Sequence, residues 1–223
     1  MIHIHNYFTP ETIQSKAREL LQAANESGRK PPLAFNPHRS ALLVLDMQEY
    51  FLDPASHAFI PSAAAILPGI QHLIDAYAQY SRPIIFTRHL NTPQDAKSMG
   101  RWWRDLIDVQ SPFSQISALL DTTKGRLLHK SQYDAFYHTN LGKILNGHGI
   151  QQVVITGVMT HLCCETTARS AFVRGYDVFF TVDGTASYNE AFHRAALTNL
   201  AHGFATLVLV EDLLAAFSSG QFE

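Results

Sequence analysis

Residues 152–175 read QVVITGVMTHLCCETTARSAFVRG, a strand pattern followed directly by a helix pattern. The run at 152–156 is short, continuous and rich in β-branched residues, which favours a strand covered on both faces. From about residue 163, Ala168, Ala171 and Phe172 recur at helical spacing, and Gly175 stands where a helix-ending glycine is expected. We therefore predict a strand at 152–156 and a helix at 163–173.

The same alternation extends in both directions along the chain. Further strands are predicted at 41–45, 83–87, 126–129, 177–182 and 205–210, and further helices at about 66–80, 139–148 and 189–201. This alternation predicts an α/β fold, a three-layer αβα sandwich around a six-stranded, parallel, doubly wound sheet of order 3-2-1-4-5-6. The stretch 90–123 interrupts the pattern as a long loop, and long loops in compact domains are usually functional or disordered.

Residues 1–38 precede this alternation. The pattern at residues 9–24 predicts a helix, with Thr9 as its N-cap and Pro10 at its first position. Residues 25–38 are rich in Pro, Gly, Asn and Ser, which is typical of a connecting arm. We expect one domain overall, made of this N-terminal helix and arm (1–38) and a main body (39–223).

The composition excludes several classes of function. Of the 223 residues, 46% are hydrophobic and 16% are charged, which is typical of a globular chain. The net charge is -2 without a basic run, so neither nucleic acid nor a membrane surface is an expected partner. The N-terminus lacks the features of a signal peptide and the apolar runs are too short to span a bilayer, so we expect a cytoplasmic protein.

Three polar residues follow predicted strands, at the edge of the sheet where ligands bind in such folds. Asp46 follows 41–45, where a partly desolvated carboxylate with a raised pKa suits a general base, although a capping role fits equally. Lys130 follows 126–129 and is either a snorkelling surface residue or a buried cation that needs a partner. Cys163 begins the predicted helix after 152–156, where the helix dipole would lower the pKa of a thiol.

The two cysteines, Cys163 and Cys164, are adjacent in the sequence and cannot join distant segments. Small buried thiols are usually inert, so one interpretation is that both cysteines only fill space in the core and do not react. In the predicted strand order, however, the first and fourth strands are neighbours. That would bring Asp46 and Cys163 together as a base and a nucleophile.

Three segments together resemble the isochorismatase-like cysteine hydrolases, a superfamily that includes isochorismatases, nicotinamidases and N-carbamoyl amidases. They are ALLVLDMQEYF (41–51), LHKSQYDAFYHTNL (128–141) and VVITGVMTHLCCETTARSAF (153–172). The resemblance covers about residues 36–215. It implies that Asp46 is the general base, that Lys130 holds Asp46 and the reacting carbonyl, and that Cys163 is the nucleophile.

The resemblance also implies a cis peptide bond between Val158 and Met159, with an oxyanion hole formed by the N–H groups of Met159 and Cys163. Cys164 would be structural. The implied activity is cofactor-free hydrolysis of a C–N bond in an amide, carbamoyl or imide compound through a Cys163 thioester. The implied partners are a small-molecule substrate and further copies of the chain, as a homodimer or homotetramer.

The sequence departs from parts of this family. Isochorismatases have Gly where Cys163 stands, whereas the N-terminal arm and the motif from Lys130 to Phe136 resemble isochorismatases more than nicotinamidases. Nicotinamidases carry an Asp-x-His metal site after the second strand, and the matching residues 86–90 (FTRHL) lack it. This disfavours nicotinamide as the substrate. His89 falls where isochorismatases place a polar substrate contact.

Substrate contacts are expected from the loops at this edge of the sheet, although aromatic residues also commonly fill cores. We expect no metal, because no set of three or four convergent ligands is evident. Trp102 and Trp103 would form a lid or a wall between subunits. The candidate substrate-binding residues are His89, Trp102, Trp103, Tyr133, Phe136, His161 and Tyr188.

Three alternatives remain open at the level of sequence. One is an isochorismatase-type vinyl ether hydrolase that uses Asp46 and tolerates Cys163. Another is a non-catalytic interaction protein. The third is a redox sensor in which Cys163 and Cys164 form a strained vicinal disulfide.

Overall fold

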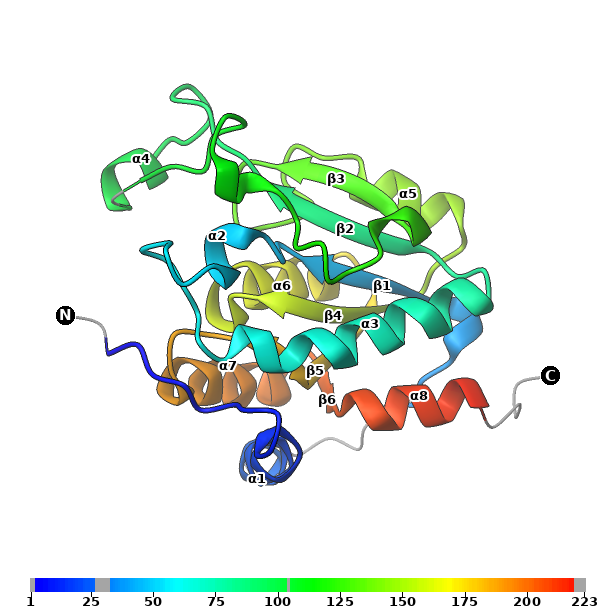
Figure 1. Ribbon diagram of the computed structural model, residues 1–223. Coiled ribbons are helices and arrows are strands. Elements are labelled where there is room, and N and C mark those ends of the chain that lie inside the picture. The colour runs from blue at the N-terminus through cyan, green and yellow to red at the C-terminus, as the bar shows by residue number, and fades with distance from the viewer. Residues whose placement is uncertain (1–2, 27–32, 104, 219–223) are drawn as a thin grey trace.

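The computed structural model of the protein describes residues 3–26, 33–103 and 105–218 (Figure 1). Its centre is a six-stranded parallel sheet in the order β3-β2-β1-β4-β5-β6, which confirms the predicted fold class and strand order. The strands are β1 (Ser40–Leu45), β2 (Ile84–His89), β3 (Arg126–Lys130), β4 (Gln152–Val158), β5 (Asp177–Ala186) and β6 (Thr206–Val208). The order reverses between β1 and β4, whose residues pair in register from Ser40 opposite Gln152 to Leu45 opposite Gly157.

Helices cover both faces of the sheet. The longer helices are α1 (Ile13–Asn25), α3 (Ala63–Gln79), α5 (Leu141–Gly147), α6 (Glu165–Val173), α7 (Glu190–Gly203) and α8 (Val210–Ser218). Figure 1 shows α3 and α8 in front of the sheet and α5 and α6 behind it, while α1 packs against α7 and β5. The central strands are buried on both sides, as their continuous apolar sequences predict.

One helix prediction and one strand prediction need correction. Helix α1 begins at Ile13 and not at residue 9, because the Thr9 carbonyl accepts the N–H groups of Thr12 and Ile13 and so closes a separate turn over residues 10–12. The apolar run at 205–210 is only partly strand. Strand β6 ends at Val208 and α8 begins at Val210, whose N–H donates to the Asp183 carboxylate (2.8 Å). Part of the predicted arm, residues 27–32, lies outside the described residues.

The described residues of the long stretch that begins at residue 90 include three short helical pieces, α4 (Met99–Trp102), η2 (Pro112–Ser114) and η3 (Thr122–Lys124). The connection after β1 adds α2 (Glu49–Leu52), and η1 (Pro37–Arg39) leads into β1. An antiparallel bridge between Gln48 and Ile116 ties the long stretch to the end of β1. The long loop is therefore packed over the carboxyl edge of the sheet.

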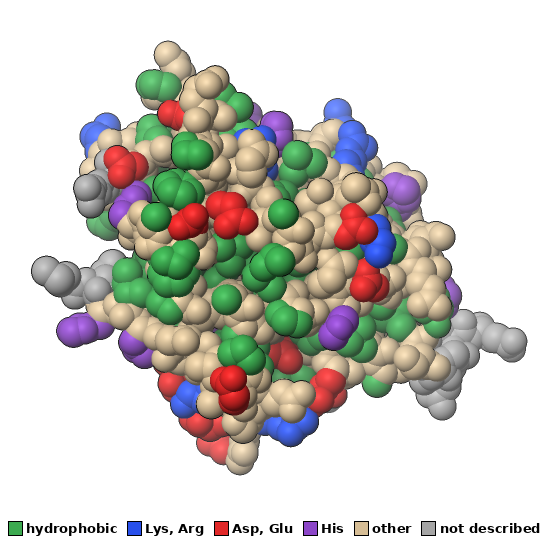
Figure 2. Space-filling view, in the orientation of Figure 1, with side chains coloured by type: hydrophobic (Ala, Val, Ile, Leu, Met, Phe, Trp, Pro, Cys, Tyr) green, Lys and Arg blue, Asp and Glu red, His purple; other side chains and the backbone are tan. Residues whose placement is uncertain are grey.

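Among the described residues, no helix is both long and apolar enough to cross a membrane. On the face shown in Figure 2, basic and acidic side chains are interspersed around α1 and along the lower edge. That face shows no broad field of basic side chains of the kind that nucleic acid binding requires.

Candidate active site

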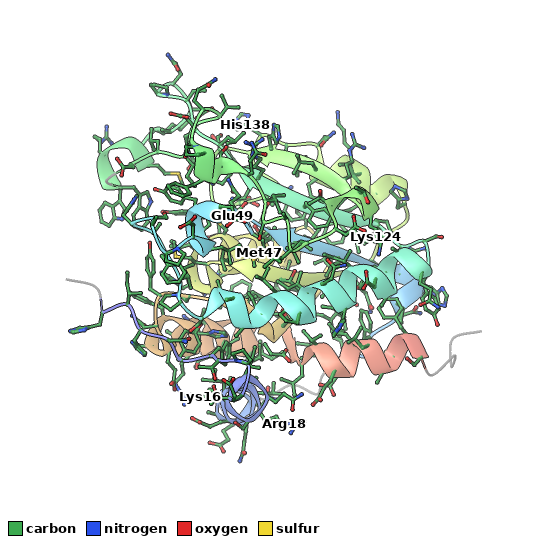
Figure 3. The ribbon with its side chains drawn as sticks, viewed as in Figure 1. Lys16, Arg18, Met47, Glu49, Lys124 and His138 are labelled. Atoms are coloured by element: carbon green, nitrogen blue, oxygen red, sulfur yellow. The ribbon has the colours of Figure 1, made fainter. Side chains whose placement is uncertain are left out.

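The candidate residues collect where the strand order reverses, at the carboxyl ends of β1, β2, β3 and β4. Asp46 directly follows β1, while His89 and Lys130 are the last residues of β2 and β3 and pair with one another in register. Cys163 lies in η4 (Thr160–Cys164), a π-helical turn that follows β4. In Figure 3, the labelled Met47 and Glu49 mark the chain just beyond β1, at the centre of this edge.

The backbone around Asp46 is tightly constrained. Asp46 has φ +54°, in the left-handed region that Asp tolerates better than most residues. Its Oδ1 accepts a hydrogen bond from Thr87 Oγ1 (2.6 Å). Beside it, Gly157 has φ +111°, and a Cβ there would lie 2.0 Å from the Leu45 carbonyl oxygen. Only glycine therefore lets β4 approach β1 at the base of the site.

Lys130 is a buried cation surrounded by four acceptors. Its Nζ lies 2.7 Å from Asp46 Oδ2, 2.9 Å from the Gln132 carbonyl oxygen, 3.2 Å from His89 Nδ1 and 3.3 Å from Cys163 Sγ. The side chains of Lys130 and Asp46 are both fully buried. The snorkelling interpretation is therefore wrong for Lys130, and the capping interpretation does not describe Asp46, whose carboxylate binds an ammonium and a threonine hydroxyl.

The electrostatics of Asp46, Lys130 and Cys163 differ from the sequence-based expectation. Burial alone would raise the pKa of Asp46, but the adjacent Lys130 ammonium holds it below its ordinary value. Burial opposes the charge of Lys130, yet Asp46 keeps the pKa of that lysine above its ordinary value. Burial, reinforced by the Asp46 carboxylate, raises the pKa of the Cys163 thiol. The resting site thus holds an ionised Asp46, a charged Lys130 and a protonated thiol.

The predicted lowering of the Cys163 pKa by a helix N-terminus is wrong, because burial and the Asp46 carboxylate raise that pKa. The predicted start of the helix at Cys163 is wrong as well. The Met159 carbonyl already accepts the N–H groups of Leu162 and Cys164, so Cys163 lies inside the π-helical turn and not at its start. The Val158–Met159 peptide bond is cis. Both cysteines are free, and Cys164 is fully buried.

Cys163 opens into a small cavity of about 70 Å³. Of the predicted substrate contacts, His89, Trp103, Tyr133 and Tyr188 line it, and Trp103 Nε1 donates to the Tyr133 hydroxyl (2.7 Å). The full lining is Tyr50, Phe51, His57, Ala58, His89, Asn91, Met99, Trp103, Asp105, Leu106, Ile107, Tyr133, Met159, Leu162, Cys163 and Tyr188.

The other three predicted contacts do not line the cavity. Trp102 is 78% exposed, whereas its neighbour Trp103 lines the cavity, and the role of the pair as a lid or a wall between subunits stays a prediction. Phe136 packs against Tyr176 and beneath Arg174. His161 is not a lining residue, and its Nδ1 forms a hydrogen bond with Ser187 Oγ (2.6 Å).

Sequence reasoning missed Tyr50, His57, Asn91 and Asp105 as cavity residues. At the cavity, His57 joins Tyr50 (Oη to Nε2, 3.3 Å) to Asp105 (Nδ1 to Oδ2, 3.4 Å). Tyr50 lies within the first motif, which could have pointed to it. His57 and Asp105 come from two separate loops, and no local pattern shows that they meet.

The donor set of this site does not suit a metal ion. Asp46, His89 and Cys163 each offer a ligand atom, and these atoms lie within 4.8 Å of one another. The Lys130 ammonium contacts all three of them, so a divalent cation there would face an adjacent buried positive charge. The charge that a metal would supply at this point comes from Lys130.

Comparisons with known proteins identify relatives of this chain. Residues 40–212 match the model of the isochorismatase domain. The chain is 39% identical to "Nicotinamidase 3" of Arabidopsis thaliana, over 80% of this chain and 88% of that protein. It is 30% identical to "Enterobactin synthase component B" of Escherichia coli K12, over 82% of this chain and 65% of that longer protein.

Among solved structures, a cysteine hydrolase from Pseudomonas syringae pv. phaseolicola superimposes with a TM-score of 0.81. It is 25% identical, and the match covers 85% of this chain and 98% of that one. From the matched domain, the relatives and the shared fold, we conclude that the chain is a hydrolase that belongs to the isochorismatase family.

Proposed function

We propose that this chain is a cysteine hydrolase that cleaves a C–N bond in a small amide, carbamoyl or imide compound. One observation carries the proposal: Cys163 Sγ faces the cavity and lies 3.3 Å from Lys130, which is ion-paired with Asp46 at 2.7 Å. A nucleophile on the cavity wall, a base and a fixed cation thus lie next to one another, as covalent catalysis requires.

The first half of the reaction forms a thioester. The Asp46 carboxylate accepts the thiol proton while Cys163 Sγ attacks the substrate carbonyl carbon. Because the pKa of the thiol is raised and that of Asp46 is lowered, this transfer is unfavourable before substrate binds and proceeds together with the attack. By family resemblance, the N–H groups of Met159 and Cys163 stabilise the oxyanion. Protonated Asp46 then gives its proton to the leaving nitrogen as the C–N bond breaks.

The second half hydrolyses the thioester. Asp46, again ionised, takes a proton from water, whose oxygen attacks the thioester carbonyl. The C–S bond breaks, the carboxylic or carbamic acid leaves, and Asp46 returns its proton to the sulfur. Lys130 keeps Asp46 ionised between the two steps because its ammonium lies against Asp46 Oδ2 in a fully buried pair.

The test is a substrate panel drawn from the names of the relatives: nicotinamide, pyrazinamide, N-carbamoylsarcosine and ureidoacrylate. Ammonia release is measured for wild type, Cys163→Ala and Cys164→Ala. We expect Cys163→Ala to lower kcat/KM by about a thousandfold or more, since the covalent route is lost. Cys164→Ala is the matched control and should keep most activity. Turnover that survives in Cys163→Ala would contradict the proposal.

A second candidate is vinyl ether hydrolysis, which is favoured by the identity to enterobactin synthase component B (30%) and to the isochorismatase of Bacillus subtilis (29%). It would use Asp46 as a proton donor and would not need a thiol. Isochorismate turnover that survives Cys163→Ala but not Asp46→Asn would establish this candidate in place of the first.

A further inference from the structure

The N-terminal segment before α1 packs beside the cavity wall, although it lies outside residues 40–212 that match the family domain. Figure 1 shows this dark blue segment running past the end of α7 to α1 at the bottom of the molecule. Tyr7 is 8% exposed and Phe8 is fully buried. The segment is therefore packed into the core and does more than connect to α1.

Three hydrogen bonds join this segment to residues 187–189. The His5 N–H donates to the Tyr188 carbonyl (3.0 Å), and Asn189 Nδ2 donates to the His3 carbonyl (2.9 Å). The Ser187 N–H donates to the Tyr7 hydroxyl oxygen (2.9 Å). The Tyr188 side chain lines the same cavity as Cys163, so these bonds hold the backbone of a cavity wall.

The Tyr7 hydroxyl is fixed on both sides. It accepts from the Ser187 N–H (2.9 Å), and it also forms a hydrogen bond with His193 Nδ1 (2.7 Å). Burial raises the pKa of Tyr7 and lowers the pKa of His193 to about 3. Both groups stay neutral near pH 7, so this contact is a permanent hydrogen bond and not a titrating switch.

Ser187 also reaches the turn that carries the nucleophile. Its hydroxyl bonds His161 Nδ1 (2.6 Å), and the His161 ring stacks on Phe192 with centroids 4.3 Å apart and planes 7° apart. His161 lies two residues before Cys163 in the π-helical turn. Ser187 therefore links Tyr7 to both sides of the site, through its neighbour Tyr188 and through His161.

We propose that Tyr7 is a positioning residue of the active site, which acts through Ser187 to hold the Tyr188 wall and the turn that carries Cys163. The proposal rests on the proposed function only for the identity of the nucleophile. Tyr7 itself does not line the cavity. Its loss should widen or loosen the cavity, whereas a purely stabilising contact would change the melting temperature alone.

The test compares two thiol reagents of different size, iodoacetamide and N-ethylmaleimide, in a Cys164→Ala background that leaves one thiol. The rates of Cys163 modification are followed by intact mass well below the melting temperature. We expect Tyr7→Phe to raise the ratio of the N-ethylmaleimide rate to the iodoacetamide rate by about three- to tenfold, the range that one lost hydrogen bond allows. Ser187→Ala should raise it too, and the double variant should show less than the product of the two effects.

The matched control is Leu20→Val, which weakens the packing of α1 but lies outside the segment that bonds residues 187–189, and it should lower the melting temperature while leaving the ratio unchanged. An unchanged ratio in Tyr7→Phe and Ser187→Ala would overturn the proposal. If Tyr7→Phe does not fold, His193→Phe decides in its place, because it removes the side-chain partner of the Tyr7 hydroxyl (2.7 Å), and an unchanged ratio there would also overturn the proposal. The ratio divides out the intrinsic reactivity of the thiol. Slow modification of Cys163 by both reagents in every variant would therefore count against the proposed function, while the ratio of the two rates would still test the role of Tyr7.

Discussion

Replacing Asp46 with Asn removes one charge of the buried pair while changing little else. Asn tolerates the left-handed backbone at φ +54°, so the variant isolates the charge from the conformation. The two charged atoms lie 2.7 Å apart and neither side chain is exposed. Coulomb's law with an effective dielectric constant of about 20 gives about 6 kcal/mol at this distance.

Lys130 in the variant would be a buried cation without its carboxylate. Breaking such a pair from one side costs about 3–5 kcal/mol, so we expect a loss of that size in the free energy of unfolding at pH 7. The assay is urea unfolding of wild type, Asp46→Asn, Lys130→Met and the double variant. The double variant should lose less than the sum of the single losses, with a coupling of about 3 kcal/mol.

The pH dependence of this loss follows from the two pKa shifts. The pKa of Asp46 is lowered on folding, so its contribution is present above the ordinary aspartate pKa of about 3.9 and disappears as pH falls through the folded value. The pKa of Lys130 is raised, so its contribution is complete below about 10.4 and disappears as pH rises through the folded value. The assignment of a strong buried pair would be refuted if each single variant lost less than about 1 kcal/mol in the free energy of unfolding, or if the double variant lost the sum of the two single losses.

Three further predictions concern the rest of the site. Gly157→Ala should lower the free energy of unfolding by about 3 kcal/mol or more, because the new Cβ would overlap the Leu45 carbonyl oxygen and the residue has a positive φ. Chemical unfolding measures this loss, and near wild-type stability would contradict the close approach of β4 to β1. Dialysis against a chelator should leave amide hydrolysis unchanged because Lys130 supplies the positive charge between Asp46, His89 and Cys163; activity that falls and returns on adding Zn²⁺ would contradict this. The rate of Cys163 alkylation should show no inflection at the ordinary thiol pKa of about 8.5, because burial and Asp46 raise the pKa of this thiol. An alkylation rate that follows a single titration at about pH 8.5 would mean that the thiol is effectively solvated.

Much of the fold could be predicted because its information is local. Continuous apolar runs such as 41–45 identify strands covered on both faces, and the alternation with helices then selects a parallel sheet. Asp46 and Lys130 could be located because the carboxyl ends of neighbouring parallel strands meet at one edge. The start of α8 could not be predicted, since the carboxylate that caps Val210 belongs to Asp183, twenty-seven positions earlier in the chain.

The parts of the site that the sequence did not reveal depend on contacts between distant segments. The pKa of Asp46 was expected to rise from burial alone, but the 2.7 Å contact with Lys130 reverses the direction. Similarly, Trp102 and Trp103 are adjacent in sequence, yet only Trp103 finds a partner at the cavity, the hydroxyl of Tyr133. Which of two neighbours faces inward is decided by how the long loop packs on the sheet.

The central claim is that Cys163 is an activated nucleophile, and iodoacetamide alkylation tests it most directly because it needs no known substrate. Intact mass is followed against pH for wild type, Cys163→Ala and Cys164→Ala. The account predicts one adduct below pH 7, lost in Cys163→Ala and retained in Cys164→Ala, since Asp46 can accept the thiol proton during attack. An adduct that persists in Cys163→Ala, or thiols that stay inert until the pH exceeds about 8.5, would contradict it.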